Sequence, residues 1–249
     1  MVTGGGRGIG RAIAQQLAGM GASITVLGRD LAALQSTADA LPPGACIARV
    51  CDVTDRAAVD AAFAAIAAKG QGLAILVNNA GAARSAKFEA TDTALWDEML
   101  RVNVTGAFHC TQAALPALRA AAAGRIVNIG STAGLVGYAY VTAYCAAKHA
   151  LVGLTRALAL ELATTRITVN AVCPGYTDTD LLSAAVGNIM AKTDRSEAEA
   201  RASLAVRNPQ RRLISPAEVA SAVAWLCLPQ SQSITGQGIA VAGGEVTTG

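Results

Sequence analysis

Short apolar runs alternate with stretches of helical periodicity along the whole chain. The runs have the length of buried strands, and the stretches between them carry Ala and Leu at spacings of three and four residues. This alternation is typical of parallel strands joined by crossover helices. The predicted strands are Met1–Thr3, Ser23–Leu27, Ala45–Val50, Leu73–Val77, Arg125–Ile129, Ile167–Val172 and Gly238–Val241. The predicted helices are Ile9–Gly19, Leu31–Ala40, Arg56–Lys69, a long pair within Thr93–Ala122, Thr142–Ala163 and Pro216–Cys227.

This pattern predicts one α/β domain over residues 1–249, with a doubly wound, seven-stranded parallel sheet and helices on both faces. The first strand is short, so either the sheet begins with a stub or the true start lies upstream. Tyr176–Gln210 is predicted to be an irregular insertion between two core strands. Loops of that length are usually functional, so we expect a lid over the substrate at about 176–210. A pair of permanently docked helices is the alternative.

Composition narrows the class of protein. The 249 residues are 53% hydrophobic and 15% charged, which suits a large core. The net charge of +3 is spread without basic runs, so nucleic acid is not an expected partner. No apolar stretch reaches the length of a membrane span, and we expect no membrane partner. Two histidines and no Cys-x-x-Cys pair disfavour a metal site. Six scattered cysteines with apolar neighbours favour buried free thiols and a reducing cytoplasm.

A glycine-rich turn, Thr3–Gly10, joins the first strand to the first helix. Glycines without Cβ atoms let the backbone approach a pyrophosphate, whose charge then faces the N–H groups at the helix start. Such a turn is weak evidence by itself, because glycine-rich loops have many structural uses. The turn predicts cofactor contacts from Gly4, Arg7, Gly8, Ile9 and Gly10.

The end of the second strand bears on which dinucleotide binds. Gly28 stands where an NAD enzyme is expected to carry a carboxylate, and Arg29 follows it. A guanidinium there can pair with the 2′-phosphate of NADP, and Arg7 can approach from the glycine turn. Asp30 precedes Leu31 and is more simply a helix N-cap. Either arginine alone could be a plain surface residue, but together they favour NADP(H) over NAD(H).

Acid–base chemistry is suggested by Tyr144 and Lys148, which lie four residues apart on one helix face. A nearby ammonium favours the phenolate and lowers the phenol pKa. Ser131 follows a buried strand, at the carboxyl end where open α/β sheets bind ligands. A hydrolase is disfavoured, because His149, Cys145 and Cys173 lack a positioned acidic partner and no G-x-S-x-G turn is present.

Together the motifs resemble those of the short-chain dehydrogenase/reductase family, single-domain Rossmann oxidoreductases that use NAD(H) or NADP(H). The resemblance spans essentially the whole chain, and the order and spacing of the motifs are specific. It is carried by Thr3–Gly10, Cys51–Val53, Asn78–Gly81, Asn103, Ser131, Tyr144-x-x-x-Lys148 and Pro174–Thr179.

The resemblance implies a role for each motif residue. Tyr144 is the general acid in reduction and the general base in oxidation. Lys148 binds the nicotinamide ribose and lowers the tyrosine pKa, Ser131 bonds the substrate carbonyl, and Asn103 holds a water of a proton relay. Further implied cofactor contacts are Asp52 and Val53 at adenine, Asn79 and Gly81 at the adenosine ribose, Thr177 and Thr179 at the carboxamide, and Ala80, Pro174 and Gly175. Three of the motif residues also have a purely structural alternative. Asp52 or Thr179 could only cap the following helix, and Asn78 could only hold loops in place.

Within the family, Gly124–Ile129 and Ile167–Gly175 look most like 3-oxoacyl-thioester reductases and polyketide ketoreductases. The expected substrate is a ketone, in the form of a 3-oxoacyl thioester of coenzyme A or carrier protein. A cyclic or polyketide-type ketone is the alternative substrate. A non-catalytic NADP-binding sensor is a less favoured alternative function. The expected apolar wall is Ala133, Leu135, Val136, Tyr138, Tyr140, Leu181, Leu182 and Val186. Cations that could meet a substrate phosphate, or equally be surface charges, are Arg195, Arg201, Arg207, Arg211 and Arg212.

The resemblance also implies an assembly. Family members commonly form homotetramers by pairing two long helices, here within Asn103–Ala122 and Thr142–Ala163. Their faces are rich in Ala and Leu, which allows close helix approach. The alternative is that these faces only cover the sheet.

Overall fold

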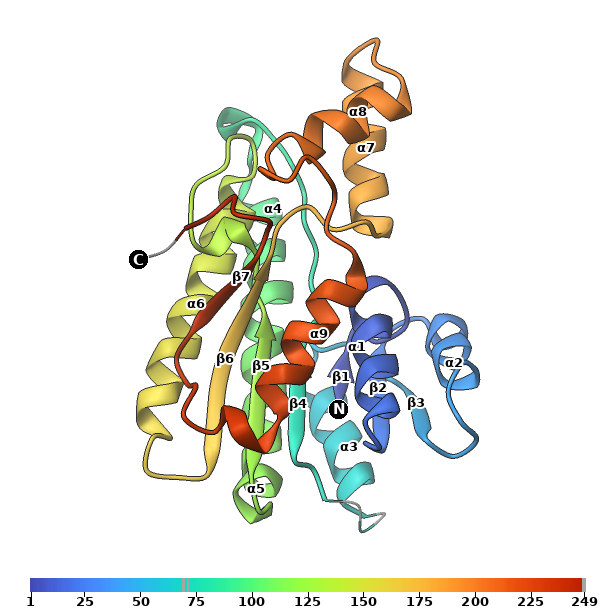
Figure 1. The fold of residues 1–249 in the computed structure, drawn as a ribbon, viewed down its shortest axis with the longest axis vertical. Coiled ribbons are helices and arrows are strands. Elements are labelled where there is room, and N and C mark those ends of the chain that lie inside the picture. The colour runs from blue at the N-terminus through green and yellow to red at the C-terminus, as the bar shows by residue number, and fades with distance from the viewer. Residues whose placement is uncertain (69, 71, 248–249) are drawn as a thin grey trace.

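A seven-stranded parallel sheet runs through the molecule in the computed structural model, which describes residues 1–68, 70 and 72–247 (Figure 1). The strand order is β3-β2-β1-β4-β5-β6-β7, and every neighbouring pair is parallel. The strands are β1 (Val2–Thr3), β2 (Ile24–Gly28), β3 (Cys46–Val50), β4 (Ile75–Asn78), β5 (Gly124–Ile129), β6 (Ile167–Pro174) and β7 (Gly238–Val241). The predicted fold class is confirmed. The order reverses between β1 and β4, and open sheets of this kind bind ligands at that point.

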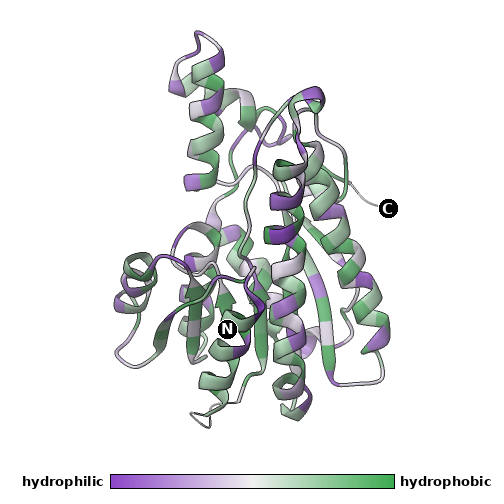
Figure 2. Cartoon of the chain, turned by 180° about the vertical axis from the view of Figure 1, so that it is seen from behind, coloured by the Kyte–Doolittle hydropathy of each residue, from purple (hydrophilic) through white to green (hydrophobic). Residues whose placement is uncertain are grey.

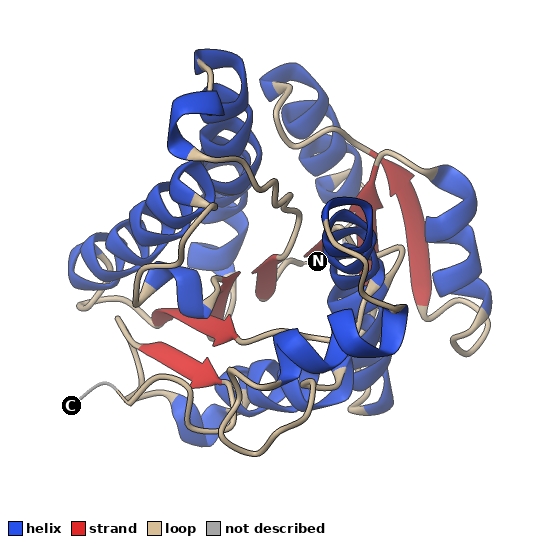
Figure 3. Cartoon of the chain, turned by 90° about the horizontal axis from the view of Figure 1, so that it is seen from above, coloured by secondary structure: helices blue, strands red, loops and turns tan. Residues whose placement is uncertain are grey.

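Helices cover both faces of the sheet (Figure 3). One apolar core joins α1, α2 and α9 to the sheet, and the other joins α3, α5 and α6 to it. The helices are α1 (Gly8–Gly19), α2 (Leu31–Asp39), α3 (Arg56–Ala67), α4 (Thr93–Leu100), α5 (Gly106–Ala120), α6 (Thr142–Glu161), α7 (Asp180–Lys192), α8 (Glu197–Ala205) and α9 (Pro216–Cys227). None of these helices is long and apolar enough to cross a bilayer.

The central strands are buried along their whole length. Every residue of β5 and β6 is buried, including the polar Arg125, Asn128, Thr168 and Asn170 that interrupt their apolar sequence. Figure 2 shows the same arrangement, with largely hydrophobic strands behind helices that carry hydrophilic residues.

A buried chain of hydrogen bonds ties the central strands to two helices. Asn78 Nδ2 donates to Asn128 Oδ1 at 2.8 Å and to Thr111 Oγ1 at 2.9 Å. Asn128 Nδ2 donates in turn to Thr155 Oγ1 at 2.8 Å. Buried polar groups of this kind are costly unless they are paired, so the chain fixes α5 and α6 relative to β4 and β5. Asn78 therefore holds β4 against β5 and α5, a structural role close to the alternative stated for it above.

One expectation about helices was wrong, and one was confirmed with an added detail. The insertion Tyr176–Gln210 is not irregular, because it contains α7 and α8, and α8 begins with a capping box made by Ser196 and Glu199. The pair of helices expected within Thr93–Ala122 is confirmed as α4 and α5, and a π-helical turn, Arg101–Thr105, joins them. The other boundaries differ by a few residues at most, and the predicted end of one helix at Lys69 lies outside the described residues.

Candidate active site

A cavity of about 1310 Å³ opens at the carboxyl ends of the strands. It takes in the glycine turn, the ends of β2 and β4 to β6, the start of α6 and the segment around α7. All the predicted catalytic and cofactor residues line it except Gly10. The structure therefore brings together residues that are up to about 170 positions apart in the chain.

The glycine turn places an uncapped helix end in this cavity. Gly4 and Gly8 adopt left-handed conformations with φ of 63° and 50°. Arg7 occupies the N-cap of α1, where no side chain bonds the free N–H groups and no acidic residue lies in the first turn. Free N–H groups and the helix dipole favour an anion there. The turn therefore fits the pyrophosphate of a dinucleotide.

The glycine turn lies directly against β1 and the end of β4. A Cβ on Gly10 would lie 2.2 Å from the Gly4 carbonyl oxygen, so no larger residue fits beneath the turn. Asn79 Nδ2 donates to the carbonyl oxygens of Thr3 and Gly4. Thr3 Oγ1 accepts from the main-chain N–H groups of Asn79 and Ala80, both at 2.9 Å. Gly10 and Asn79 thus hold the turn that would carry the phosphates.

The adenosine end of the cavity contains two arginines in different states. Arg7 pairs with Asp30 at 2.8 Å and lies 3.8 Å from Asp180 at the start of α7. Asp30 is also the N-cap of α2, as predicted, and accepts from the Ala33 N–H. Arg29 is exposed, and no ion pair engages it within the described residues. Of the two arginines, Arg29 is therefore the one that a phosphate could engage without breaking an ion pair.

Asp52 lines the cavity and does not cap α3, whose N-cap is Asp55. Burial acts to raise the pKa of Asp52, but hydrogen bonds from Thr54 and the nearby Arg29 and Arg101 outweigh it and lower the pKa. Asp52 is therefore a fixed carboxylate acceptor beside the adenosine end. No sequence motif singles out Arg101, which comes from the π-helical turn.

The reactive side chains lie where β5 ends against α6. Lys148 is buried, and its Nζ donates to the Ile129 carbonyl oxygen at 2.8 Å and lies 5.7 Å from the centre of the Tyr144 ring. Ser131 follows β5, and its Oγ accepts from the Ala133 N–H. His149 is exposed and its Nδ1 lies near the Cys145 carbonyl oxygen, while all six cysteines are free. Tyr144, Lys148 and Ser131 thus face one cavity, and His149 does not.

Burial dominates the titration of this group. It raises the pKa of Tyr144 to about 12, and a hydrogen bond with Ser131 acts in the opposite direction. It lowers the pKa of Lys148 to about 8. Lys148 is not among the groups that shift the Tyr144 pKa, so the expected lowering of that pKa by the lysine is not seen. Lys148 still carries a proton at pH 7.

Asn103 is buried in the π-helical turn and holds the loop after β4. Its Nδ2 donates to the carbonyl oxygens of Ala82 and Met99, both at 2.9 Å, and its Oδ1 accepts from the Ala82 N–H at 3.3 Å. Both amide hydrogens are therefore used. A relay water would have to bond Oδ1 or the main chain.

The predicted carboxamide contacts lie at the entry to α7. Thr177 Oγ1 donates to the Gly175 carbonyl oxygen, and Thr179 Oγ1 donates to that of Thr177. Thr179 is the N-cap of α7, but its side chain makes no capping hydrogen bond. The alternative that Thr179 only caps this helix is therefore not supported. A Cβ on Gly8 would lie 3.1 Å from Thr179 Cγ2, which places this entry against the glycine turn.

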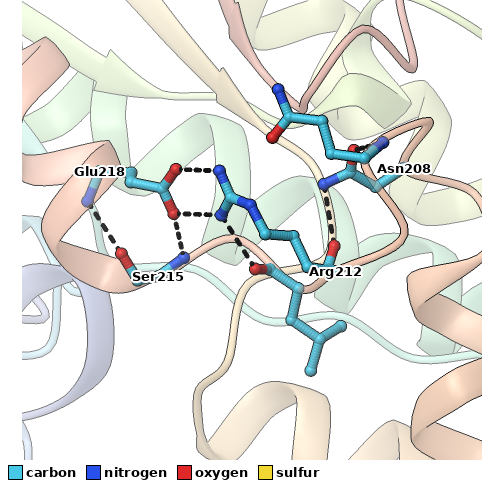
Figure 4. A network of polar contacts seen from close by, with 6 residues as sticks. Asn208, Arg212, Ser215 and Glu218 are labelled. Carbon is cyan, nitrogen blue, oxygen red and sulfur yellow. Dashed lines mark hydrogen bonds and ion pairs between the residues drawn. The ribbon is translucent and has the colours of Figure 1, made fainter.

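Helices α7 and α8 form a small unit with a core of its own, standing beyond the ends of the strands (Figure 1). The chain that leaves α8 is tied to α9, as Figure 4 shows. Asn208 Nδ2 donates to the Arg212 carbonyl oxygen, and the Arg212 guanidinium pairs with Glu218 at 2.6 Å. Ser215 and Glu218 form a capping box at the start of α9. The unit thus has an anchored base and few contacts with the main cores.

The expected substrate wall is partly right. Ala133, Tyr138, Tyr140, Leu181 and Leu182 line the cavity. The other three members do not. Leu135 packs on Val152, Ala171 and Cys173. Val136 is 39% exposed and is not among the residues that line the cavity. Val186 is buried in the core of the α7 and α8 unit.

Of the five predicted cations only Arg195 lines the cavity, where Lys192 joins it. Arg201 pairs with Asp178, and Arg212 with Glu218. Arg207 lies over the Tyr138 ring instead. Arg211 has a positive φ of 58° outside the cavity.

Comparison with known proteins agrees with this geometry. A family model described as short chain dehydrogenase matches residues 1–188. The chain is 38% identical to 2-(S)-hydroxypropyl-CoM dehydrogenase 3 of Xanthobacter autotrophicus, over 98% of this chain and 94% of that protein. It is 34% identical to the 3-oxoacyl-[acyl-carrier-protein] reductase FabG of Vibrio cholerae, over 98% and 95%. A crystal structure of actinorhodin polyketide ketoreductase with NADPH matches with a TM-score of 0.93 and 36% identity, over 98% and 95% of the two chains.

The first prediction concerns the glycine turn. Gly10→Ala should lower dinucleotide affinity about tenfold or more, because the new methyl group displaces the Gly4 carbonyl and with it the phosphate cradle. Gly19→Ala is the matched control, since a Cβ there meets nothing within 4 Å. Isothermal titration with NADP and NAD measures the effect. Unchanged affinity in Gly10→Ala would show that the turn does not carry the phosphates.

The second prediction concerns residues 176–210. We expect this segment to act as a lid that exchanges amide hydrogens faster than α6 and slows when NADP and a substrate analogue bind, because its own core is small and separate. Hydrogen exchange with and without ligand measures this. Protection equal to that of α6 and insensitive to ligand would support the docked-helix alternative instead.

Proposed function

The chain belongs to the short-chain dehydrogenase family, and from that premise we propose that it is an NADP(H)-dependent reductase of a ketone, most specifically of a 3-oxoacyl thioester. The family makes it an oxidoreductase acting on CH–OH groups with a nicotinamide dinucleotide. The observation that carries the proposal is the meeting of Tyr144, Lys148 and Ser131 in one cavity with the uncapped N-terminus of α1.

The proposed chemistry is hydride transfer coupled to proton transfer. When bound, NADPH supplies a hydride from C4 of its nicotinamide to the carbonyl carbon. Ser131 Oγ would hydrogen-bond the carbonyl oxygen, and the Tyr144 phenol would give that oxygen its proton. Lys148 has two N–H donors left beyond the Ile129 bond, which suits it to the nicotinamide ribose and to the phenolate that forms. Asn103 would support the relay that returns the proton.

NADP(H) is favoured by the residues at the end of β2. Arg29 is unpaired within the described chain, and Gly28 carries no carboxylate to repel a 2′-phosphate. Packing does not explain the glycine, because a Cβ there would meet only the Leu34 side chain at 3.4 Å. The structural match of 36% identity holds NADPH, which agrees with this choice.

A thioester substrate is supported by the character of the cavity. Aromatic and aliphatic side chains form the wall near Tyr144, while Lys192 and Arg195 line the cavity from the end of α7 and beyond. An apolar acyl chain with an anionic carrier fits both features. The polyketide-type ketone stays the alternative, favoured by the match to a polyketide ketoreductase. The intact set of Asn103, Ser131, Tyr144 and Lys148 disfavours a non-catalytic sensor.

We also propose that the enzyme is a homotetramer in a reducing cytoplasm. The two helices expected to pair each carry an exposed large apolar side chain, Phe108 on α5 at 45% and Leu160 on α6 at 80%. The six free cysteines support the compartment.

Removal of the phenol proton donor tests the reaction. Tyr144→Phe should lower kcat for a 3-oxoacyl thioester by about a hundredfold or more while NADPH still binds, because only the transferable proton is lost. Lys148→Ala should weaken both turnover and NADPH binding. NADPH absorbance and titration measure the two effects. Wild-type protein that reduces no ketone would refute the function, and normal NADPH affinity in Lys148→Ala would refute the role of the lysine.

Cofactor choice is tested at two neighbouring positions. Arg29→Ala should raise KM for NADPH about tenfold or more, since a charge-assisted phosphate contact is worth about 1.5 to 3 kcal/mol. Gly28→Asp should also raise it and lower KM for NADH, because a carboxylate repels the 2′-phosphate and accepts from ribose hydroxyls. Equal or better use of NADH by the wild type would overturn the assignment.

The assembly is tested by mass. Light scattering should give four times the chain mass of 25.0 kDa. Replacing Leu160 by Glu should lower the mass if its exposed face lies in an interface, because a buried unpaired charge is costly. A wild-type mass equal to that of one chain would exclude the tetramer.

A further inference from the structure

A polar cluster outside the reactive group joins three separate segments behind the cavity wall. Tyr138, on the loop after Ser131, places its hydroxyl 2.7 Å from Glu245 Oε1 and 2.7 Å from Thr132 Oγ1. A phenol has one proton, so it donates to the carboxylate and accepts from the threonine. Arg207, from the chain that leaves α8, lies 4.7 Å from the centre of the Tyr138 ring. Tyr138 lines the cavity, and Glu245 stands behind it.

The segment after β7 is shaped to bring Glu245 to this place. Gly243 and Gly244 have φ values of 60° and 92°, and the Glu245 N–H donates to the Ala242 carbonyl oxygen, which reverses the chain. A Cβ on Gly175 would lie 3.0 Å from Glu245 Oε2, so the carboxylate lies against the turn that follows β6. The position of the Glu245 carboxylate is therefore restricted by the chain reversal at Gly243 and Gly244 and by the turn at Gly175.

The base of the α7 and α8 unit rests on the same segment. A Cβ on Gly243 would overlap Asn208, which is buried and bonded to the Arg212 main chain (Figure 4). Arg207 is the residue before Asn208, so the guanidinium over the Tyr138 ring stands on this anchored base. The ring is thus held on one side by a cation and at its hydroxyl by a carboxylate.

The arrangement makes the tyrosine ring a fixed wall. Burial raises the pKa of the Tyr138 phenol and the adjacent Glu245 raises it further, so the hydroxyl keeps its proton and the hydrogen bond at neutral pH. Without the carboxylate the ring would keep only the Thr132 hydrogen bond and the Arg207 contact, and its rotamer would be less restricted beside the substrate.

We propose that Glu245 is a positioning residue for the substrate: by accepting the Tyr138 hydroxyl it fixes the aromatic wall of the cavity and joins that wall to the segment after β7 and the base of α7 and α8. The proposal rests on the proposed function, because the wall is useful only if a ketone binds beside it. Its effect is on substrate affinity and not on the chemical step, since Glu245 does not line the cavity.

Steady-state kinetics of four variants test the proposal. Glu245→Ala and Tyr138→Phe should each raise KM for the ketone about 3- to 10-fold, with a smaller change in kcat and an unchanged KM for NADPH. Glu245→Gln should stay close to the wild type, because its amide oxygen still accepts from the phenol. Glu161→Ala, which removes an exposed carboxylate at the end of α6, is the matched control. The double variant Glu245→Ala, Tyr138→Phe should be no worse than either single variant.

The outcomes separate this proposal from the function beneath it. Wild-type protein that reduces ketones while Glu245→Ala leaves their KM unchanged overturns the positioning role alone. So does a Glu245→Ala variant in which kcat and the urea midpoint fall while both KM values rise, because that pattern belongs to a merely structural residue. Wild-type protein that reduces no ketone overturns the function and the positioning role with it.

Discussion

The buried ammonium of Lys148 is the constraint on which the site depends. Removing such a charge from water costs several kcal/mol unless acceptors replace the lost hydration, and the Ile129 carbonyl oxygen at the end of β5 supplies one. That bond requires α6 to lie directly against the loop after β5. A Cβ on Gly134 would lie 2.7 Å from the Lys148 carbonyl oxygen, so the close approach needs a glycine there. Beneath it, the Asn128 to Thr155 hydrogen bond joins the same strand and helix. With its pKa lowered only to about 8, the lysine enters the site charged.

The parallel sheet brings the other residues of the site to the edge where Lys148 lies. All seven strands point their carboxyl ends the same way, so the residues that follow β1, β2, β4, β5 and β6 meet at one edge although they are distant in sequence. Side chains then fix the loops to one another. Asn79 holds the glycine turn against β4, and Asn103 holds the loop after β4 against the π-helical turn. Both amides are used structurally, which explains why a polar residue at each place can matter without touching a substrate.

The sequence predicted what local patterns determine. Strand and helix order followed from apolar periodicity, and the N-cap at Asp30 followed from its place before an apolar helix. The predictions that were wrong depend on contacts distant in the chain. Helices α7 and α8 are stabilised by a small core that they share, and their apolar residues show no strong helical periodicity. The sequence pattern therefore predicted an irregular segment at Tyr176–Gln210. Leu135 looked like cavity wall from its place after Ser131, but it packs inward on β6. Glu245 gave no signal, because its partner Tyr138 lies 107 residues away.

Arg7 lies between the start of α2 and the start of α7, where it contacts a carboxylate of each. Arg7 pairs with Asp30 and lies near Asp180, while Thr179 lies against Gly8. These ion pairs are exposed and individually weak, so a phosphate with two charges can take Arg7 from them at little cost. Once Arg7 turns to a phosphate, Asp180 loses its partner, but the first turn of α7 still favours a carboxylate there. Arg29 has no such competing ion pair in the described chain, so an anion could pair with it without breaking a contact at the start of α7.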